Sequence, residues 1–187
     1  INAPEAWDLE SAAQNDVIVA VIDTGVLPTH SDLSGNLVAG FDFINSSATL
    51  TDTNGHGTHV SGTIAAVSHN NIGISGVSKS NNIKVMPLRK NFSTSQSVAA
   101  IHFAKNNNAK VINASWGSYG TNSQFDDIAL YNAIRDFPGI FVEAAGNASF
   151  NHNDGLDAHK DFPSAFKLTS SYGPGLTNIV VVSATDQ

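Results

Sequence analysis

The chain has 187 residues, of which 41% are hydrophobic, and a formal net charge of −7 with a pI near 5.3. A chain of this size can bury one sizeable core, so we expect a single domain over residues 1–187. Nine Lys and Arg residues give no basic surface for phosphate backbones, which argues against nucleic-acid binding, and the lack of cysteine excludes disulfides, thiolate zinc sites and a cysteine nucleophile.

No apolar run reaches the roughly 18 residues of a membrane span. The opening residues, INAPEAWDLE, lack the basic and apolar regions of a signal peptide. We therefore expect no membrane span, and we expect that any targeting piece has been removed or was never included.

Along the chain, apolar strands alternate with helical stretches. A short helix from Asn2 to Glu10 precedes the run Val17–Ile22, which shows no polar alternation and is typical of a strand covered on both faces. Asp23 follows at the end of that strand. Further strands are expected at Leu37–Phe43, Ile83–Leu88, Lys110–Ser115, Ile140–Ala145 and Ile179–Ala184, and helices at His56–Val67, Thr94–Asn107 and Ser123–Phe137.

This alternation predicts an α/β fold, a doubly wound and mainly parallel sheet with helices on both faces. Ligands of such sheets bind beyond the carboxyl ends of the strands. Four features fall at that edge: Asp23, His56, Ser115–Gly117 and Gly146–Asn147. Taken singly, Asp23 also fits a turn residue, and only the convergence of all four features at one edge indicates a site.

Four motifs occur in a defined order: VIDTG from Val21, NGHGTHVSGTIA from Asn54, NASWG from Asn113 and AAGN from Ala144. Together they resemble the motifs of the subtilisin-like serine peptidases, the subtilases or peptidase S8 family. The resemblance implies a three-layer α/β/α catalytic domain, a serine endopeptidase that acts on peptide or protein substrates, and a secreted or extracellular location.

The resemblance also implies roles for individual residues. His56 is the general base, and Asp23 is the carboxylate that orients its ring and stabilises the imidazolium. Asn147 supplies a side-chain amide to the developing oxyanion. Substrate binding is assigned to Ser115, Trp116 and Gly117, which pair with the substrate backbone, and to Ala144, Ala145 and Gly146, which line the pocket for the side chain before the scissile bond.

Three further expectations concern residues within these motifs. Trp116 stands where a smaller aliphatic residue is common in the family, which predicts a narrowed or aromatic-favouring pocket. Gly57 and Gly62 each cost about 1 kcal/mol in a helix interior, so we expect this helix to pack closely against the sheet. His59 is expected to be a packed residue behind the site.

A structural calcium site is the second implication of the resemblance. The matching residues are Asp32 and, in the loop after the His56 helix, Asn70, Ile72 and Ile74. The alternative reading of this loop is a polar helix end. Zinc binding by the HGTH sequence is not expected, because metalloprotease histidines stand four apart with a glutamate between them.

The nucleophilic serine of the family lies in a Gly-Thr-Ser-Met-Ala motif, and no Gly-Thr-Ser occurs in this sequence. We therefore expect a truncated catalytic domain that is inactive alone, with the serine outside this chain, for example on a companion C-terminal fragment. The sheet should then expose apolar surface.

Two functions of other classes stay open at this point. One is a noncatalytic peptide-binding pseudoprotease built on the same groove. The other, a nucleotide-binding protein, lacks G-x-G-x-x-G after the first strand and a P-loop.

Overall fold

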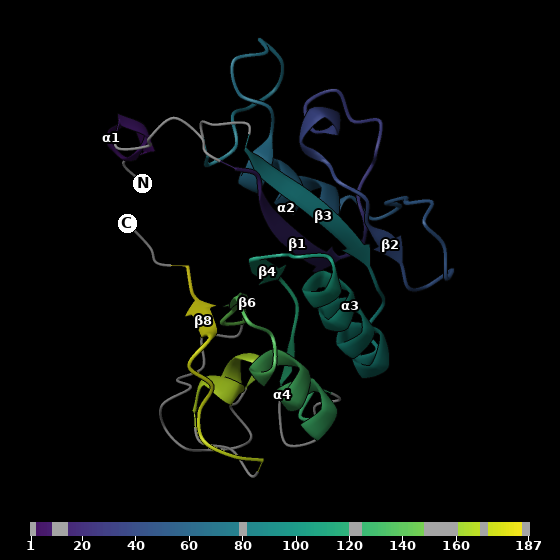
Figure 1. The fold of residues 1–187 in the computed structure, drawn as a ribbon, viewed down its shortest axis with the longest axis vertical. Helices are drawn as coiled ribbons and strands as arrows, with labels where there is room; N and C mark the ends of the chain where they lie inside the picture. Colours follow the sequence, from purple (N-terminus) through teal and green to yellow (C-terminus); the bar gives the residue numbers. More distant parts are fainter. Residues whose placement is uncertain are drawn as a thin grey trace.

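A computed structural model describes residues 3–8, 15–78, 82–119, 125–147, 161–168 and 172–184 of the chain. Within these residues, six parallel strands form one sheet in the order β2-β3-β1-β4-β6-β8 (Figure 1). The strands are β1 (Val17–Asp23), β2 (Phe41–Asp42), β3 (Ile83–Arg89), β4 (Val111–Ala114), β6 (Ile140–Ala144) and β8 (Ile179–Val182). The predicted parallel sheet is confirmed.

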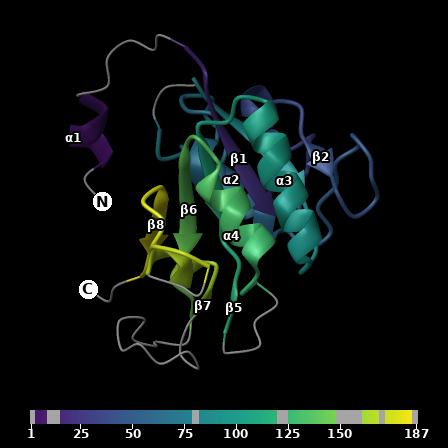
Figure 2. The ribbon, with the colours of Figure 1, turned by 60° about the horizontal axis from the view of Figure 1, so that its bottom comes forward.

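Helices cover both faces of the sheet, as expected for a doubly wound fold. Figure 2 shows α3 (Thr94–Asn106) and α4 (Ile128–Arg135) side by side in front of the sheet, with α2 (His56–Ala65) behind it. A further short helix, α1 (Ala3–Asp8), lies near the N-terminus. The expected ends of that helix at Asn2 and Glu10 lie outside the described residues.

Alternate residues of β1 explain why the strand is apolar throughout. Val19 and Val21 pack with Ala65 of α2, whereas Ala20 and Ile22 belong to the larger core under α3 and α4. Because both faces are buried, the run carries no polar residue until Asp23, where the strand reaches the edge of the sheet.

The strand β2 is much shorter than the predicted Leu37–Phe43, and Pro87 accounts for the difference. Val85 and Arg89 of β3 accept hydrogen bonds from residues 38 and 43 on the β2 side. Pro87 lies between them on the same side of β3 and has no N–H to donate, so pairing is interrupted there. Gly40 fits against this point, where a Cβ would come within 1.9 Å of the Pro87 carbonyl oxygen.

The helix α4 begins at Ile128, five residues later than the predicted Ser123. Asp127 caps it by accepting hydrogen bonds from the backbone N–H groups of Ala129 and Leu130 at 2.7 and 3.2 Å. The apolar stripe was predicted correctly: Leu130, Ala133, Ile134 and Phe137 are all buried. Residues 120–124 lie outside the described part of the chain.

The long segment between β6 and β8 contains local structure where the chain is described. A strand β7 (Asp161–Phe162) pairs antiparallel with β5 (Ser118–Tyr119), and a 3₁₀ helix η3 (Ser164–Lys167) follows it. Another 3₁₀ turn, η1 (Ser34–Asn36), precedes β2.

The two glycines of α2 differ in their surroundings. A Cβ on Gly57 would meet the Gly25 carbonyl oxygen at 2.2 Å, so this glycine lets the helix start approach the turn after β1, as expected. Gly62 has open space in the direction of a Cβ, so close packing there is a wrong prediction.

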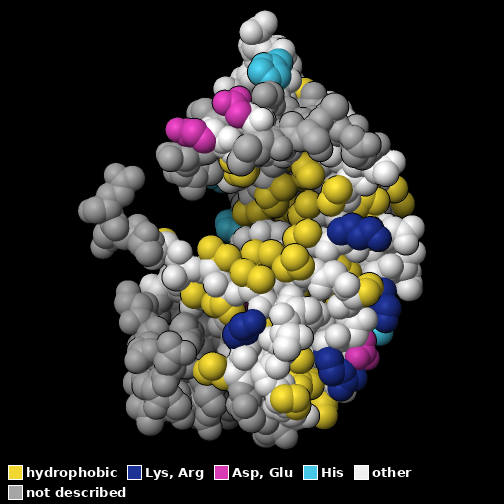
Figure 3. All heavy atoms as spheres, turned by 60° about the vertical axis from the view of Figure 1, so that its left-hand side comes forward, with side chains coloured by type: hydrophobic (Ala, Val, Ile, Leu, Met, Phe, Trp, Pro, Cys, Tyr) yellow, Lys and Arg dark blue, Asp and Glu magenta, His cyan; other side chains and the backbone are white. Residues whose placement is uncertain are grey.

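Among the described residues, no helix covers one face of the sheet at β6 and β8. Ile140, Val180 and Val182 are 48%, 46% and 53% exposed, and the strand register places them on the face that α2 covers further along the sheet. Figure 3 looks at this side of the molecule and shows a band of hydrophobic side chains across its middle. This apolar surface agrees with the expectation drawn from the sequence.

Candidate active site

The ends of β1, β3 and β4 bring the candidate residues to one edge of the sheet. Asp23 is the last residue of β1, and Ser115–Gly117 follow β4 directly. The first residue of α2 is His56, and its helix starts against the turn that leaves β1. Residues separated by 33 or more positions along the chain therefore meet where the sequence predicted.

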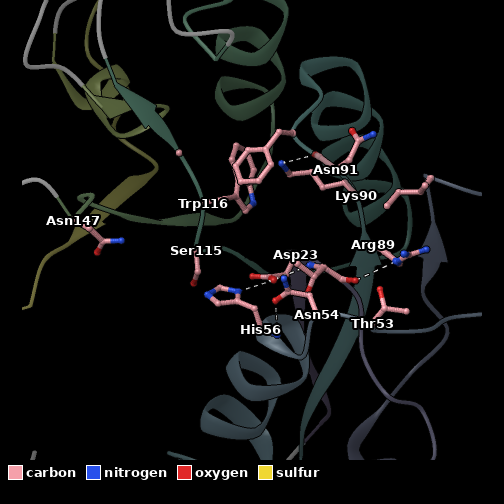
Figure 4. Close-up of a pocket in the computed structure, with 14 residues that line it drawn as sticks. Asp23, Thr53, Asn54, His56, Arg89, Lys90, Asn91, Ser115, Trp116 and Asn147 are labelled. Carbon is pink, nitrogen blue, oxygen red and sulfur yellow. Dashed lines mark hydrogen bonds and ion pairs between the residues drawn. The ribbon is translucent and has the colours of Figure 1, made fainter.

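Asp23 and His56 are in direct contact. The Nδ1 atom of His56 lies 2.8 Å from Oδ1 of Asp23 (Figure 4). The side chain of His56 is 51% exposed, whereas that of Asp23 is 3% exposed. The same Oδ1 accepts the backbone N–H of Thr24 at 2.7 Å. The second oxygen, Oδ2, is buried and accepts no hydrogen bond from the described residues.

This contact favours one tautomer of His56. An ionised carboxylate can only accept, so a hydrogen bond from Nδ1 to such a carboxylate would leave the lone pair of a neutral ring on Nε2. A half-exposed imidazole with a free Nε2 lone pair can take a proton from a nucleophile in the groove.

The start of α2 is held by Asp52, which lies outside the four sequence motifs. Its Oδ1 accepts the Thr24 hydroxyl at 3.0 Å and the backbone N–H groups of Asn54 and Gly55 at 3.1 and 2.9 Å. Its Oδ2 accepts the backbone N–H and the hydroxyl of Thr58 at 2.9 and 2.6 Å.

These bonds connect both members of the Asp23–His56 pair. Thr24, which Asp52 holds, is the neighbour of Asp23 and also accepts the backbone N–H of Gly57 at 2.9 Å. Partial burial alone would raise the pKa of Asp52, but hydrogen bonds from Thr58, Gly55 and Thr24 outweigh it and lower the pKa to about 2. An Asp shortly before a helix start is the one sequence signal that could have identified this residue.

A groove of about 490 Å³ lies at this edge of the sheet (Figure 4). Six of the predicted site residues line it: Asp23, His56, Ser115, Trp116, Gly117 and Asn147. Figure 4 shows Asn147 across the groove from Asp23, beyond Ser115. Its role as an oxyanion donor stays a prediction.

The three residues before Asn147 are placed differently. Ala144 ends β6, and Ala145 donates its backbone N–H to Val182 of β8 at 2.8 Å. Gly146 has a φ of 91°, a value that favours glycine, and turns the chain toward Asn147. These residues do not line the described groove, so the pocket assigned to Ala144, Ala145 and Gly146 stays a prediction.

Ser115 lines the groove directly after the end of β4. Its hydroxyl oxygen accepts a hydrogen bond from the side-chain amide of Asn113 at 2.9 Å. Within the described residues, no serine hydroxyl is hydrogen-bonded to His56. His59 is exposed and lines a separate cavity with His30 and Leu27, so its prediction as a packed residue is wrong.

The residues predicted for calcium are brought together. Asp32 is buried, and its two oxygens accept the side-chain amide of Asn70 at 2.7 Å and the backbone N–H of Ile74 at 2.9 Å. Ile72 donates its N–H to Oδ1 of Asn70 at 3.0 Å. A carboxylate, an amide oxygen and main-chain carbonyls are ligands that Ca²⁺ takes. Asn70 turns its N–H toward Asp32, so its oxygen could serve an ion there only after rotation of the amide.

Known proteins are similar to this chain in sequence and in fold. Residues 14–187 match the subtilase family. The chain is 32% identical to thermitase of Thermoactinomyces vulgaris over 190 residues, covering 100% of this chain and 61% of that protein. It is 33% identical to an extracellular protease of Xanthomonas campestris, covering 92% of this chain and 36% of that protein.

A solved structure agrees with these sequence relatives. The epidermin leader peptide processing serine protease of Staphylococcus aureus superposes with a TM-score of 0.70 and 28% identity, over 92% of this chain and 47% of that one. The chain therefore spans less than two thirds of the length of each of these three proteins. Because the family match covers residues 14–187, the chain belongs to the subtilase family of serine proteases.

Proposed function

We propose that this chain forms the Asp–His part of the active site of a serine endopeptidase. The observation that carries the proposal is the 2.8 Å contact between the buried carboxylate of Asp23 and the half-exposed imidazole of His56 in a groove. Membership of a family of serine proteases supports the same reaction. The substrate would be a peptide or protein.

In the proposed reaction, His56 Nε2 removes the proton of a serine hydroxyl as the oxygen attacks the peptide carbonyl carbon. Asp23 stabilises the imidazolium that forms. Collapse of the tetrahedral intermediate breaks the carbon–nitrogen bond, and His56 passes its proton to the leaving amine. The side-chain amide of Asn147 donates to the oxyanion, and the backbone of Ser115–Gly117 pairs with the substrate.

The nucleophilic serine would lie outside these 187 residues, because the sequence contains no Gly-Thr-Ser. A segment or companion chain that carries the serine must then complete the site. The 187-residue chain alone is expected to be inactive.

A fluorophosphonate probe tests this proposal, because it labels an activated serine covalently. We expect labelling of the protein that includes the serine-bearing segment, its loss in His56→Ala, and no labelling of the 187-residue chain alone. His102→Ala, a change on the surface of α3, is the matched control and should leave labelling unchanged.

Labelling that survives His56→Ala would contradict the assignment of the base. Peptide binding without any labelling of the complete protein would instead indicate a noncatalytic peptide-binding protein.

We also propose that the loop around Asp32 binds a structural calcium ion. We further propose that the protein is secreted. The grouping of Asp32 with Asn70 and Ile74 supports the first. The second is supported by similarity to an extracellular protease. As a separate finding, none of the helices in the described residues could span a membrane.

A further inference from the structure

A lysine ammonium lies among three aromatic rings at one side of the groove. The Nζ atom of Lys90 is 3.6 Å from the ring centroid of Trp116, 5.0 Å from that of Phe125 and 5.7 Å from that of Phe92. The whole residue is only 6% exposed. In Figure 4 its side chain runs toward the ring of Trp116. A cation over aromatic faces is a favourable arrangement, and here the cation is part of the protein itself.

Two of the three aromatic walls of this recess, Trp116 and Phe125, are fixed to the core. Trp116 donates its indole N–H to the carbonyl oxygen of Ile22 at 2.7 Å. Its ring centroid lies 4.9 Å from that of Phe125, which is fully buried. Lys90 is anchored too, since its backbone N–H bonds the Asp23 carbonyl oxygen at 2.9 Å and its ammonium donates to the Asn91 carbonyl oxygen at 3.2 Å.

The charge of Lys90 is balanced from within the protein. Burial lowers the pKa of Lys90 to about 7, although the carboxylates of Glu143 and Asp23 act in the opposite direction. Glu143 is itself buried, on the strand β6. An amine balanced by internal carboxylates and covered by rings is poorly placed to attract a charged ligand.

The recess borders the part of the groove where a substrate would lie. Lys90, Phe92 and Trp116 line the same groove as Ser115 and His56, and Phe92 is 66% exposed. Without the Lys90 side chain, the three rings would enclose an apolar recess that opens toward the groove.

We propose that Lys90 is a specificity-determining residue: its side chain fills this aromatic recess, so the groove favours peptides with a small side chain at the position facing Trp116 and excludes large apolar ones. The inference rests on the proposed peptide-binding function. A competing possibility, that Lys90 swings out and pairs with an acidic side chain of the substrate, predicts different results in the same experiment.

Variants that separate volume from charge test the proposal. Lys90→Ala empties the recess, whereas Lys90→Met keeps it filled without a charge. Each is combined with Glu143→Gln, because Glu143 is buried and interacts electrostatically with Lys90, so removing the lysine charge alone would leave this carboxylate without that compensation. Glu143→Gln alone is the background. Lys84→Ala is the matched control, since Lys84 contacts Gly35 and Asn36 away from the groove.

Binding is measured for peptides that carry Ala, Phe or Glu at each of four successive positions. At one position, Lys90→Ala/Glu143→Gln should shift the ratio of dissociation constants toward Phe by about tenfold or more, the effect expected for added apolar room. Lys90→Met/Glu143→Gln and Lys84→Ala should keep the preference for Ala. Far-UV circular dichroism confirms that each variant is folded.

An unshifted ratio in the folded Lys90→Ala/Glu143→Gln variant would overturn the proposal. So would an equal shift in the Lys90→Met variant, or a preference for Glu that both replacements abolish. If no peptide binds the wild-type protein, the peptide-binding function fails, and the role of Lys90 in specificity fails with it. Normal binding with an unchanged preference refutes the role of Lys90 alone.

Toluene, which stands for the phenylalanine side chain, examines the recess without any peptide. It should shift the Trp116 indole N–H resonance in Lys90→Ala/Glu143→Gln and leave it unchanged in Lys90→Met/Glu143→Gln. Identical behaviour of the two variants would show that Lys90 does not fill the recess, which also overturns the proposal.

Discussion

At the scale of single residues, the site depends on groups that hold His56 and Asp23 as well as on the pair itself. Asp52 accepts five hydrogen bonds, four of them from residues within two positions of His56 and one from Thr24, the neighbour of Asp23. Both positions are therefore tied to one carboxylate. We expect its loss to disturb the geometry of the pair more than a lost surface contact would.

Replacing Asp52 by Asn removes the charge and turns one acceptor oxygen into a donor. Because hydrogen bonding lowers the pKa of Asp52 from 3.8 to about 2, its carboxylate stabilises the fold fully above pH 4, and this contribution is lost as the pH falls to 2. We expect Asp52→Asn to cost about 2 kcal/mol at pH 7 and to lower the melting temperature by about 4–8 °C.

In the complete protein, Asp52→Asn should lower kcat with little change in KM, because it misplaces the base and not the substrate strand. Asp127→Asn is the control, since Asp127 also accepts backbone N–H groups at a helix start but lies far from His56 in sequence and on another helix. A fall in kcat of equal size in both variants would contradict a positioning role for Asp52.

At the scale of elements, the sequence predicted the strands that are buried on both faces and the edge where their ends meet. The sequence-based prediction was wrong where contacts between distant residues determine the length of a strand or the exposure of a side chain. The length of β2 depends on Pro87 of the neighbouring strand, and the exposure of His59 depends on what packs beside α2. Lys90 and Trp116 follow the ends of two different strands, so no local sequence pattern predicts their contact.

The loop that wraps around Asp32 carries a prediction of its own. If calcium binds there, treatment with a chelator should lower the melting temperature, because the bound ion stabilises only the folded state. Differential scanning calorimetry with and without EDTA measures the shift, and Asp32→Asn should abolish it. An unchanged melting temperature in the wild-type protein would contradict the assignment of a calcium site to this loop.

At the scale of the whole molecule, the sheet is covered unevenly. Helix α2 packs over β1 and β3, whereas Ile140, Val180 and Val182 on the same face are about half exposed. Exposed apolar patches of this kind promote association. Within the described residues β8 is the edge strand of the sheet, and edge strands present unpaired backbone groups.

We therefore expect the 187-residue chain to associate as its concentration rises. Val180→Lys/Val182→Lys should reduce the association seen by sedimentation velocity, because it places two charges on the bare face. Val77→Lys, at an equally exposed valine in a loop, should have no effect. Association that is unaffected by the β8 changes would place the contact on another surface.

Asp23 is expected to fix the imidazole of His56 for proton transfer, and ¹⁵N NMR of the His56 ring nitrogens in the 187-residue chain measures this. We expect the neutral ring to carry its proton on Nδ1, and we expect Asp23→Asn to alter this tautomer while the surface control Asp136→Asn leaves it unchanged. A His56 ring that carries its proton on Nε2, or one that does not respond to Asp23→Asn, would contradict the account.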